Sequence, residues 1–132
     1  MIRRLGVVAA IAAIVAADFP WGQLQNHAHW YKVAWIPFVS PPVRAPDVAE
    51  NIVLFVPLGV MLALTVRRHV MSATLLIATV LACAGELTQV FSHGRIPSTT
   101  DIVCNVAGAC AGAWLITRRR SWSSDPPPAE GR

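Results

Sequence analysis

Apolar and polar residues are arranged in blocks along this chain, with four long apolar segments separated by charged residues and prolines. A helix of about 20 apolar residues crosses a bilayer. Its backbone groups are all paired internally, as the hydrocarbon core requires. We therefore predict an all-α fold, an integral membrane four-helix bundle. The expected helices cover residues 5–21, 48–66, 70–91 and 102–117.

The first apolar segment has a second interpretation. Two arginines precede the run Leu5–Ala17, which ends in small residues, as a secretory signal peptide does. Cleavage after Ala17 would leave three membrane helices, whereas a retained helix would extend to the aromatic residue Trp21. The sequence leaves both alternatives open.

The regions outside the helices have distinct compositions. The connection 18–47 is rich in aromatic residues and prolines, and we expect it to lie on the outer membrane interface, where aromatic rings with a polar edge are favoured. Its His27 and His29 have a spacing that is too common to indicate a metal site, so we predict no metal and no cofactor. The proline-rich segment 118–132 predicts a disordered cytoplasmic tail, which leaves 1–117 as the membrane domain.

Charge supports the membrane prediction and fixes an expected orientation. The chain has 132 residues and a formal net charge of +4, but only 14% of its residues are charged, against about 25% in soluble domains. The basic residues flank the apolar segments, which argues against nucleic acid as a partner. Placing most of them inside predicts a bacterial cytoplasmic (inner) membrane protein with both termini in the cytoplasm. The arginines on that side are Arg3, Arg4, Arg67, Arg68, Arg118, Arg119, Arg120 and Arg132.

Polar side chains recur at helical spacings near the outer ends of the last three apolar segments. A charge at the centre of a membrane helix costs about 2.5–3.5 kcal/mol, so such residues usually face the protein interior and mark a site. These positions fall at one depth, where Glu50 also lies. The predicted polar intramembrane cluster consists of Asn51, Glu86, Gln89, Arg95, Asp101 and Asn105. Within it we favour an ion pair between Glu86 and Arg95, with Asp101 as the second candidate partner.

Small residues predict close helix packing. Gly108 and Gly112 form a GxxxG motif, which allows another helix to approach closely. Phe55 and Gly59 lie on a comparable stripe of the second helix, and Pro57, which falls within it, is expected to loosen that helix.

Asp101 has a simpler alternative role. Ser98 and Asp101 have the spacing of a capping box, in which an acidic side chain three residues after the cap accepts the backbone N–H of the cap. On this interpretation Asp101 marks only the start of the fourth helix.

The order of these residues resembles the VanZ-like family, small bacterial membrane proteins named for a teicoplanin-resistance accessory protein. The resemblance covers residues 35–116. It is carried by Ile36-Pro37-Phe38, the stretch Asn51–Gly59, Glu86-x-x-Gln89, Gly94-Arg95 and Asp101-x-x-x-Asn105-x-x-Gly108-x-x-x-Gly112. It implies a four-helix domain in the cytoplasmic membrane and a link to the cell envelope or to antibiotic resistance. It implies no catalytic mechanism.

Three functions fit these features. The favoured one is a non-enzymatic protein that acts at the outer leaflet, where the polar cluster binds an amphiphilic ligand or a lipid-linked envelope component. The second is a membrane enzyme on a lipid-linked phosphate, with Glu86 or Asp101 as general base and Arg95 on the phosphate. The third is a structural partner whose Gly108 and Gly112 face docks a second copy or another membrane protein.

Overall fold

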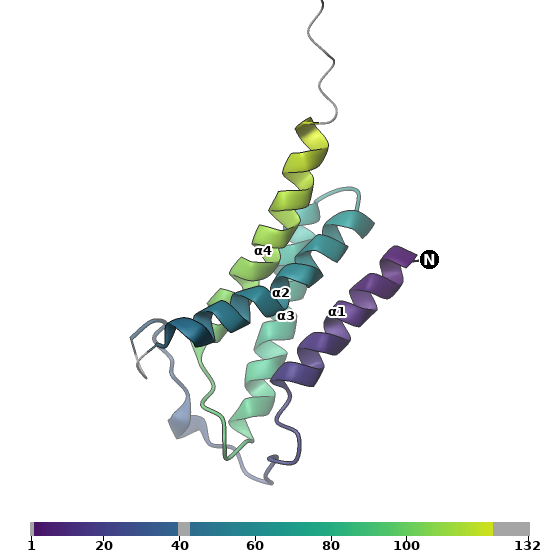
Figure 1. Cartoon of the computed structure of the whole chain (residues 1–132). Coiled ribbons are helices and arrows are strands. Elements are labelled where there is room, and N and C mark those ends of the chain that lie inside the picture. Colours follow the sequence, from purple (N-terminus) through teal and green to yellow (C-terminus); the bar gives the residue numbers. More distant parts are fainter. Residues whose placement is uncertain (1, 40–42, 123–132) are drawn as a thin grey trace, which may run out of the picture.

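The computed structural model describes residues 2–39 and 43–122, and in this part of the chain the regular elements are all helical. No strand occurs there, only two isolated bridges. The all-α prediction is therefore confirmed. The elements are α1 (Ile2–Asp18), the short 3-10 helix η1 (Trp30–Lys32), α2 (Ala45–Thr65), α3 (Val70–Val90) and α4 (Thr99–Trp122), and they form a bundle (Figure 1).

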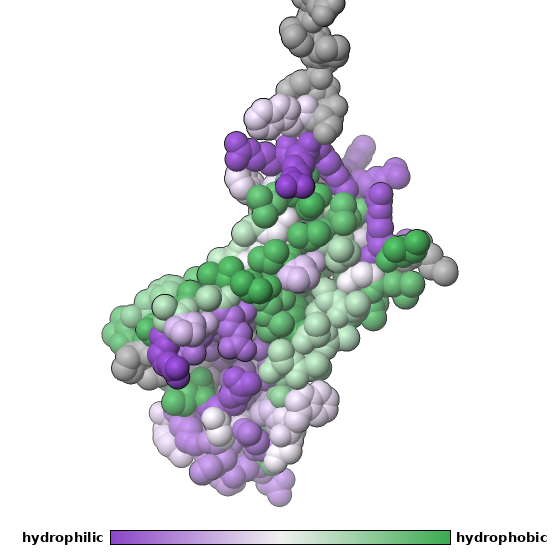
Figure 2. Space-filling model, viewed as in Figure 1, coloured by the Kyte–Doolittle hydropathy of each residue, from purple (hydrophilic) through white to green (hydrophobic). Residues whose placement is uncertain are grey.

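Among the described residues, three helices are long and apolar enough to cross a membrane, namely α2, α3 and α4, with 21, 21 and 24 residues. Figure 2 shows a hydrophobic band between two polar ends of the molecule, as a bilayer-embedded surface requires. α1 has 17 residues and packs against the bundle through the buried residues Ala10 and Ile14. Whether Leu5–Ala17 is retained or cleaved stays a prediction.

Several predicted boundaries need correction. The starts of α1, α2 and α4 lie three residues earlier than expected, at Ile2, Ala45 and Thr99. The first helix ends at Asp18 and not at Trp21, because Pro20 lacks a backbone N–H and disfavours helical geometry at the residue before it. The fourth helix continues to Trp122, so residues 118–122 belong to α4 and not to a disordered tail. The remainder of the predicted tail, 123–132, lies outside the described residues.

Local contacts explain why α4 is longer than its apolar segment. The Thr117 hydroxyl donates to the carbonyl oxygen of Ala113 at 3.1 Å. The Arg118 guanidinium lies over the Trp114 ring, 5.0 Å from its centroid. Basic residues in the last turn also interact favourably with the negative end of the helix dipole.

The closest helix pair is α2 and α4, which cross with their backbones in contact. A side chain at Gly59 would meet the backbone of Ala109, and one at Gly108 would meet the carbonyl oxygen of Ile52. Gly112 stands in the same relation to the carbonyl oxygen of Val56. The small residues of α4 therefore face α2 of the same chain, and the predicted packing role of both GxxxG glycines and Gly59 corresponds to this contact.

The two other predicted packing residues differ in where they lie. Phe55 is fully buried in the core, together with Leu58. Pro57 lies inside α2 but on its exposed face, so assigning it to helix packing is wrong. The physical reason is the helical period, which turns position 57 away from the face that carries Phe55 and Gly59.

The connection between α1 and α2 covers the ends of α3 and α4. Backbone N–H groups of Gln25 and His29 donate to the carbonyl oxygens of Phe91 and Val90, each at 2.8 Å. Further along, the Ala34 N–H donates to the Pro97 carbonyl oxygen at 2.9 Å. These bonds hold the connection against the loop between α3 and α4.

Acidification is expected to loosen this connection. His29 is 5% exposed, and its burial, with the charge of Lys32 and the nearby His27 and His93, lowers its pKa from the ordinary 6.5. His29 therefore binds a proton more readily in the unfolded connection than in the folded one. The stability of the folded connection is complete above the ordinary pKa of histidine and falls as the pH drops through that value. Hydrogen exchange of residues 24–34, corrected for intrinsic rates, should rise between about pH 7.5 and about pH 5.

A matched pair of variants checks this cause. His29→Gln should abolish the pH dependence of exchange, whereas His69→Asn, in the turn before α3, should keep it. Exchange that changes equally in the wild type and in His29→Gln would show that another group is responsible.

Candidate functional site

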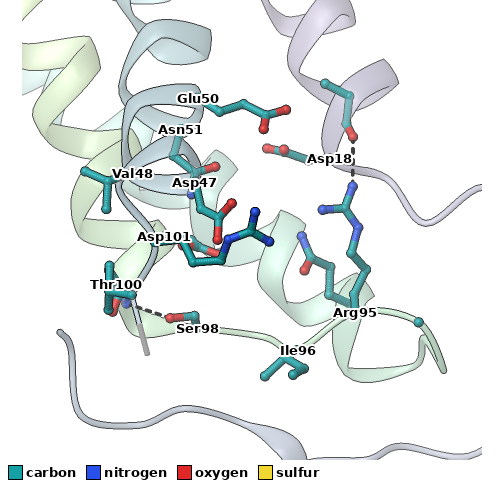
Figure 3. Close-up of a pocket in the computed structure, with 15 residues that line it drawn as sticks. Asp18, Asp47, Val48, Glu50, Asn51, Arg95, Ile96, Ser98, Thr100 and Asp101 are labelled. Carbon is teal, nitrogen blue, oxygen red and sulfur yellow. Dashed lines mark hydrogen bonds between the residues drawn. The ribbon is translucent and has the colours of Figure 1, made fainter. Parts of the chain in front are cut away.

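A pocket of about 470 Å³ opens where the end of α1, the start of α2, the end of α3 and the start of α4 meet (Figure 3). Apolar side chains such as Val43, Val48 and Ile96 contribute part of its wall. Most of the lining is polar and includes charges of both signs. The polar lining residues are Asp18, Arg44, Asp47, Glu50, Asn51, Gln89, Arg95, Ser98, Thr100 and Asp101.

The predicted cluster is divided between this pocket and the layer beneath it. Asn51, Gln89, Arg95 and Asp101 line the pocket. Glu86 is buried behind the wall and touches it through Ser98. Asn105, only 2% exposed, lies one turn further along α4, and its Oδ1 has no hydrogen-bond partner among the described residues. Four residues of the predicted cluster therefore meet at one cavity, and the other two, Glu86 and Asn105, lie deeper in the bundle.

Glu86 anchors the start of α4. Its Oε2 accepts a hydrogen bond from the backbone N–H of Ser98 at 2.6 Å. The Ser98 hydroxyl in turn accepts the N–H of Thr100 at 3.1 Å, as an N-cap does. In a capping box the Ser98 N–H would bond to Asp101, but here a carboxylate from another helix occupies it. Asp101 is thus left to face the pocket.

The predicted Glu86–Arg95 ion pair is wrong. Although all three residues are described, neither Glu86 nor Asp101 forms an ion pair with Arg95. Instead, one Arg95 nitrogen, Nη2, donates to the carbonyl oxygen of Ala17 at 3.4 Å. The loop after α3 carries Arg95 across to the end of α1 (Figure 3), so its charge acts on Glu86 only at a distance.

Electrostatic interactions link the carboxylates around the pocket. Asp18 is attracted by Arg95 and repelled by Glu50. Asp101 is repelled by Asp47 and Asp18, attracted by Arg95, and interacts with the side chain of Asn51. With four carboxylates and two guanidinium groups in the lining, the pocket has a formal negative charge.

Sequence reasoning missed Asp18, Arg44 and Asp47. They lie in or at the ends of the connection 18–47, where a charged residue is ordinarily solvated. The signal that was available is their position: Asp18 and Asp47 bound the connection, so both must lie where α1 and α2 reach the outer interface.

Three histidines lie close together where the connection between α1 and α2 meets the loop after α3. The rings of His27 and His29 have centroids 4.6 Å apart, and those of His29 and His93 are 5.9 Å apart. Within residues 2–39 and 43–122, however, no group of three or more histidine, cysteine or acidic side chains has the geometry to hold a metal ion. The nitrogens of His29 bond to neighbours instead, Nε2 to Gln25 Oε1 at 2.7 Å and Nδ1 to the Tyr31 hydroxyl at 3.4 Å.

The fold and the site define a helical membrane protein with a mixed-charge pocket at one end of its bundle. The family model described as VanZ/LLP1 matches residues 5–120. The chain therefore belongs to the VanZ-like family, which confirms the resemblance. No curated protein and no solved structure gives a significant match.

Proposed function

We propose that this VanZ-like protein acts at the outer leaflet of the bacterial cytoplasmic membrane, where its pocket binds an amphiphilic ligand. That ligand is a lipid-linked envelope component or a lipid-like antibiotic, and no chemical conversion is involved. The observation that carries the proposal is the pocket itself, a polar cavity at the end of a hydrophobic bundle (Figure 2, Figure 3). Pockets of this volume suit the head of a small molecule.

The distribution of charge supports an outward-facing pocket. All acidic residues that the structure describes lie at the pocket end, namely Asp18, Asp47, Glu50, Glu86 and Asp101. The arginine clusters lie at the opposite end of the bundle: Arg3 and Arg4 in the first turn of α1, Arg67 and Arg68 between α2 and α3, and residues 118–120 near the end of α4. Arginine flanking a membrane helix favours the cytoplasmic side, so both termini are inside and the pocket is outside.

The surroundings of the pocket suit an amphiphile. Val43 and Ile96 line it and are 40% and 52% exposed. On α3, Leu87 is 52% exposed toward the same end of the bundle. If the polar head of an amphiphile lies in the pocket, its acyl chain lies beside this apolar surface, which is also in contact with lipid.

The two rival functions receive less support. The face that the assembly hypothesis needs, Gly108 and Gly112, is filled by α2 of the same chain. For the enzyme hypothesis, the described residues of the lining include no cysteine or histidine that could act as a nucleophile, and the Ser98 hydroxyl is engaged as a helix cap. The family resemblance adds the link to glycopeptides such as teicoplanin.

Pocket variants are expected to fail in a complementation test. A deletion strain is screened against envelope-targeting antibiotics, including teicoplanin. When it expresses Asp101→Asn or Arg95→Gln, its susceptibility should stay close to that of the deletion strain and not return to the wild-type level. Removing one partner of a charged ligand contact costs about 2–5 kcal/mol in affinity. Immunoblots of membrane fractions establish equal protein levels.

Arg68→Gln is the matched control, because it removes one exposed arginine at the opposite end of the bundle. It should complement fully. Complete complementation by both pocket variants at wild-type protein levels would contradict the proposed function.

A further inference from the structure

Carboxylates face one another across the pocket. Asp18, at the end of α1, and Glu50, on α2, point toward each other (Figure 3), and their interaction is repulsive. Asp101 is in turn repelled by Asp47 and Asp18. Holding like charges around a shared space is unfavourable, and a positive group in that space relieves it.

Arg95 does not fill this space. Its guanidinium donates to the Ala17 carbonyl oxygen at 3.4 Å, which holds it at the wall formed by the end of α1. In Figure 3 it lies beside Asp18, on the side of the pocket away from Asp101. Arg95 therefore fixes a positive charge at this wall. Arg44 is the second guanidinium group of the lining, and against four carboxylates the two leave the cavity with an excess of negative charge.

A bare metal ion fits this arrangement poorly. The described acidic side chains do not converge closely enough to hold a metal ion. An ammonium group makes its bonds through three N–H donors, so it can bridge carboxylates that are further apart. The pocket of about 470 Å³ also has room for a whole headgroup.

Resting on the proposed function, we infer that the pocket selects amphiphiles whose headgroup carries a protonated amine next to a phosphate. The amine lies among Asp18, Glu50 and Asp101, and the phosphate accepts hydrogen bonds from Arg95. Charge-assisted bonds of this kind are stronger than neutral ones, which makes the amine the feature that the pocket discriminates.

Two probes that differ only in the amine test this inference. The full chain is purified in an uncharged maltoside detergent, and binding is followed through tryptophan fluorescence. The probes are lysophosphatidylethanolamine and its N-acetylated form, which keeps the phosphate but has no positive charge. We expect the amine form to bind at least about tenfold more tightly.

Variants assign the preference to residues. Glu50→Gln, at an exposed position, and Asp18→Asn should each reduce the discrimination between the probes. Arg95→Gln should weaken both probes and leave their ratio unchanged, and Arg68→Gln should change neither. Size-exclusion profiles and unfolding midpoints establish that each variant is folded.

The possible failures are distinct. Equal affinity for both probes that still depends on Arg95 would overturn the amine preference and leave the proposed function standing. No binding of either probe, or displacement of the amine probe by Ca²⁺ alone, would also overturn the inference. The complementation test in the deletion strain then decides separately on the proposed function.

Discussion

Replacing Gly59 by alanine is expected to destabilise the protein, although alanine is the better helix former. A Cβ atom at position 59 would overlap the carbonyl group of Ala109, which is backbone and cannot rotate away. α2 would therefore have to move off α4. Overpacking of this kind typically costs about 1–3 kcal/mol, against a gain in helix propensity of about 0.8–1 kcal/mol.

The measurement is the thermal unfolding midpoint of the purified protein in detergent. Gly85→Ala on α3 is the control, because the nearest atoms to its added Cβ belong to Asp18 and lie 4.0 Å away. That variant should be as stable as the wild type or slightly more stable. If Gly59→Ala matched Gly85→Ala, the close contact between α2 and α4 would not exist in the protein.

The same contact positions the pocket. Close approach of α2 and α4 brings the starts of both helices together, and these carry Asn51 and Asp101. Larger residues at the glycines would separate the two side chains. The small residues in the core therefore set the distance between the polar residues at the mouth of the pocket.

Local properties of the sequence were sufficient for much of this structure. Each apolar block forms a helix because burial of its backbone in lipid leaves no other internal pairing. The polar residues on successive helices meet at one end because depth follows directly from position along each helix. Asn51, Gln89 and Asp101 could be assigned to one site on this basis.

What the sequence could not predict depends on the path of the loops. Arg95 is five residues beyond the end of α3, so its direction is set by contacts with α1 and not by helical spacing. The GxxxG motif likewise predicts that another helix can approach closely, but it does not identify that helix. That α2 of the same chain fills this face required the three-dimensional structure.

Glu86→Ala is expected to detach the start of α4 from α3. The Glu86 carboxylate, 8% exposed, accepts the Ser98 N–H at 2.6 Å. An intramolecular hydrogen bond contributes about 0.5–1.5 kcal/mol, and a buried donor left without a partner costs about 1–3 kcal/mol. Hydrogen exchange of residues 92–101 should therefore increase, and the unfolding midpoint should fall.

Glu86→Gln separates the hydrogen bond to Ser98 from other roles of the carboxyl group. The amide oxygen of glutamine can still accept the Ser98 N–H, so this variant should keep most of the protection of residues 92–101. Leu87→Ala, one position away and exposed, is the control for truncation at this turn. Exchange in Glu86→Ala that equals the wild type would remove the anchoring role.

The same pair of variants distinguishes positioning from ligand binding. Glu86 lies behind the wall, where it holds Ser98 and the loop that carries Arg95. In the complementation test, Glu86→Gln should therefore retain function, while Glu86→Ala should lose it together with the order of the loop. A Glu86→Gln variant that keeps its loop protected but fails to complement would instead place the carboxyl group of Glu86 in the binding of the ligand.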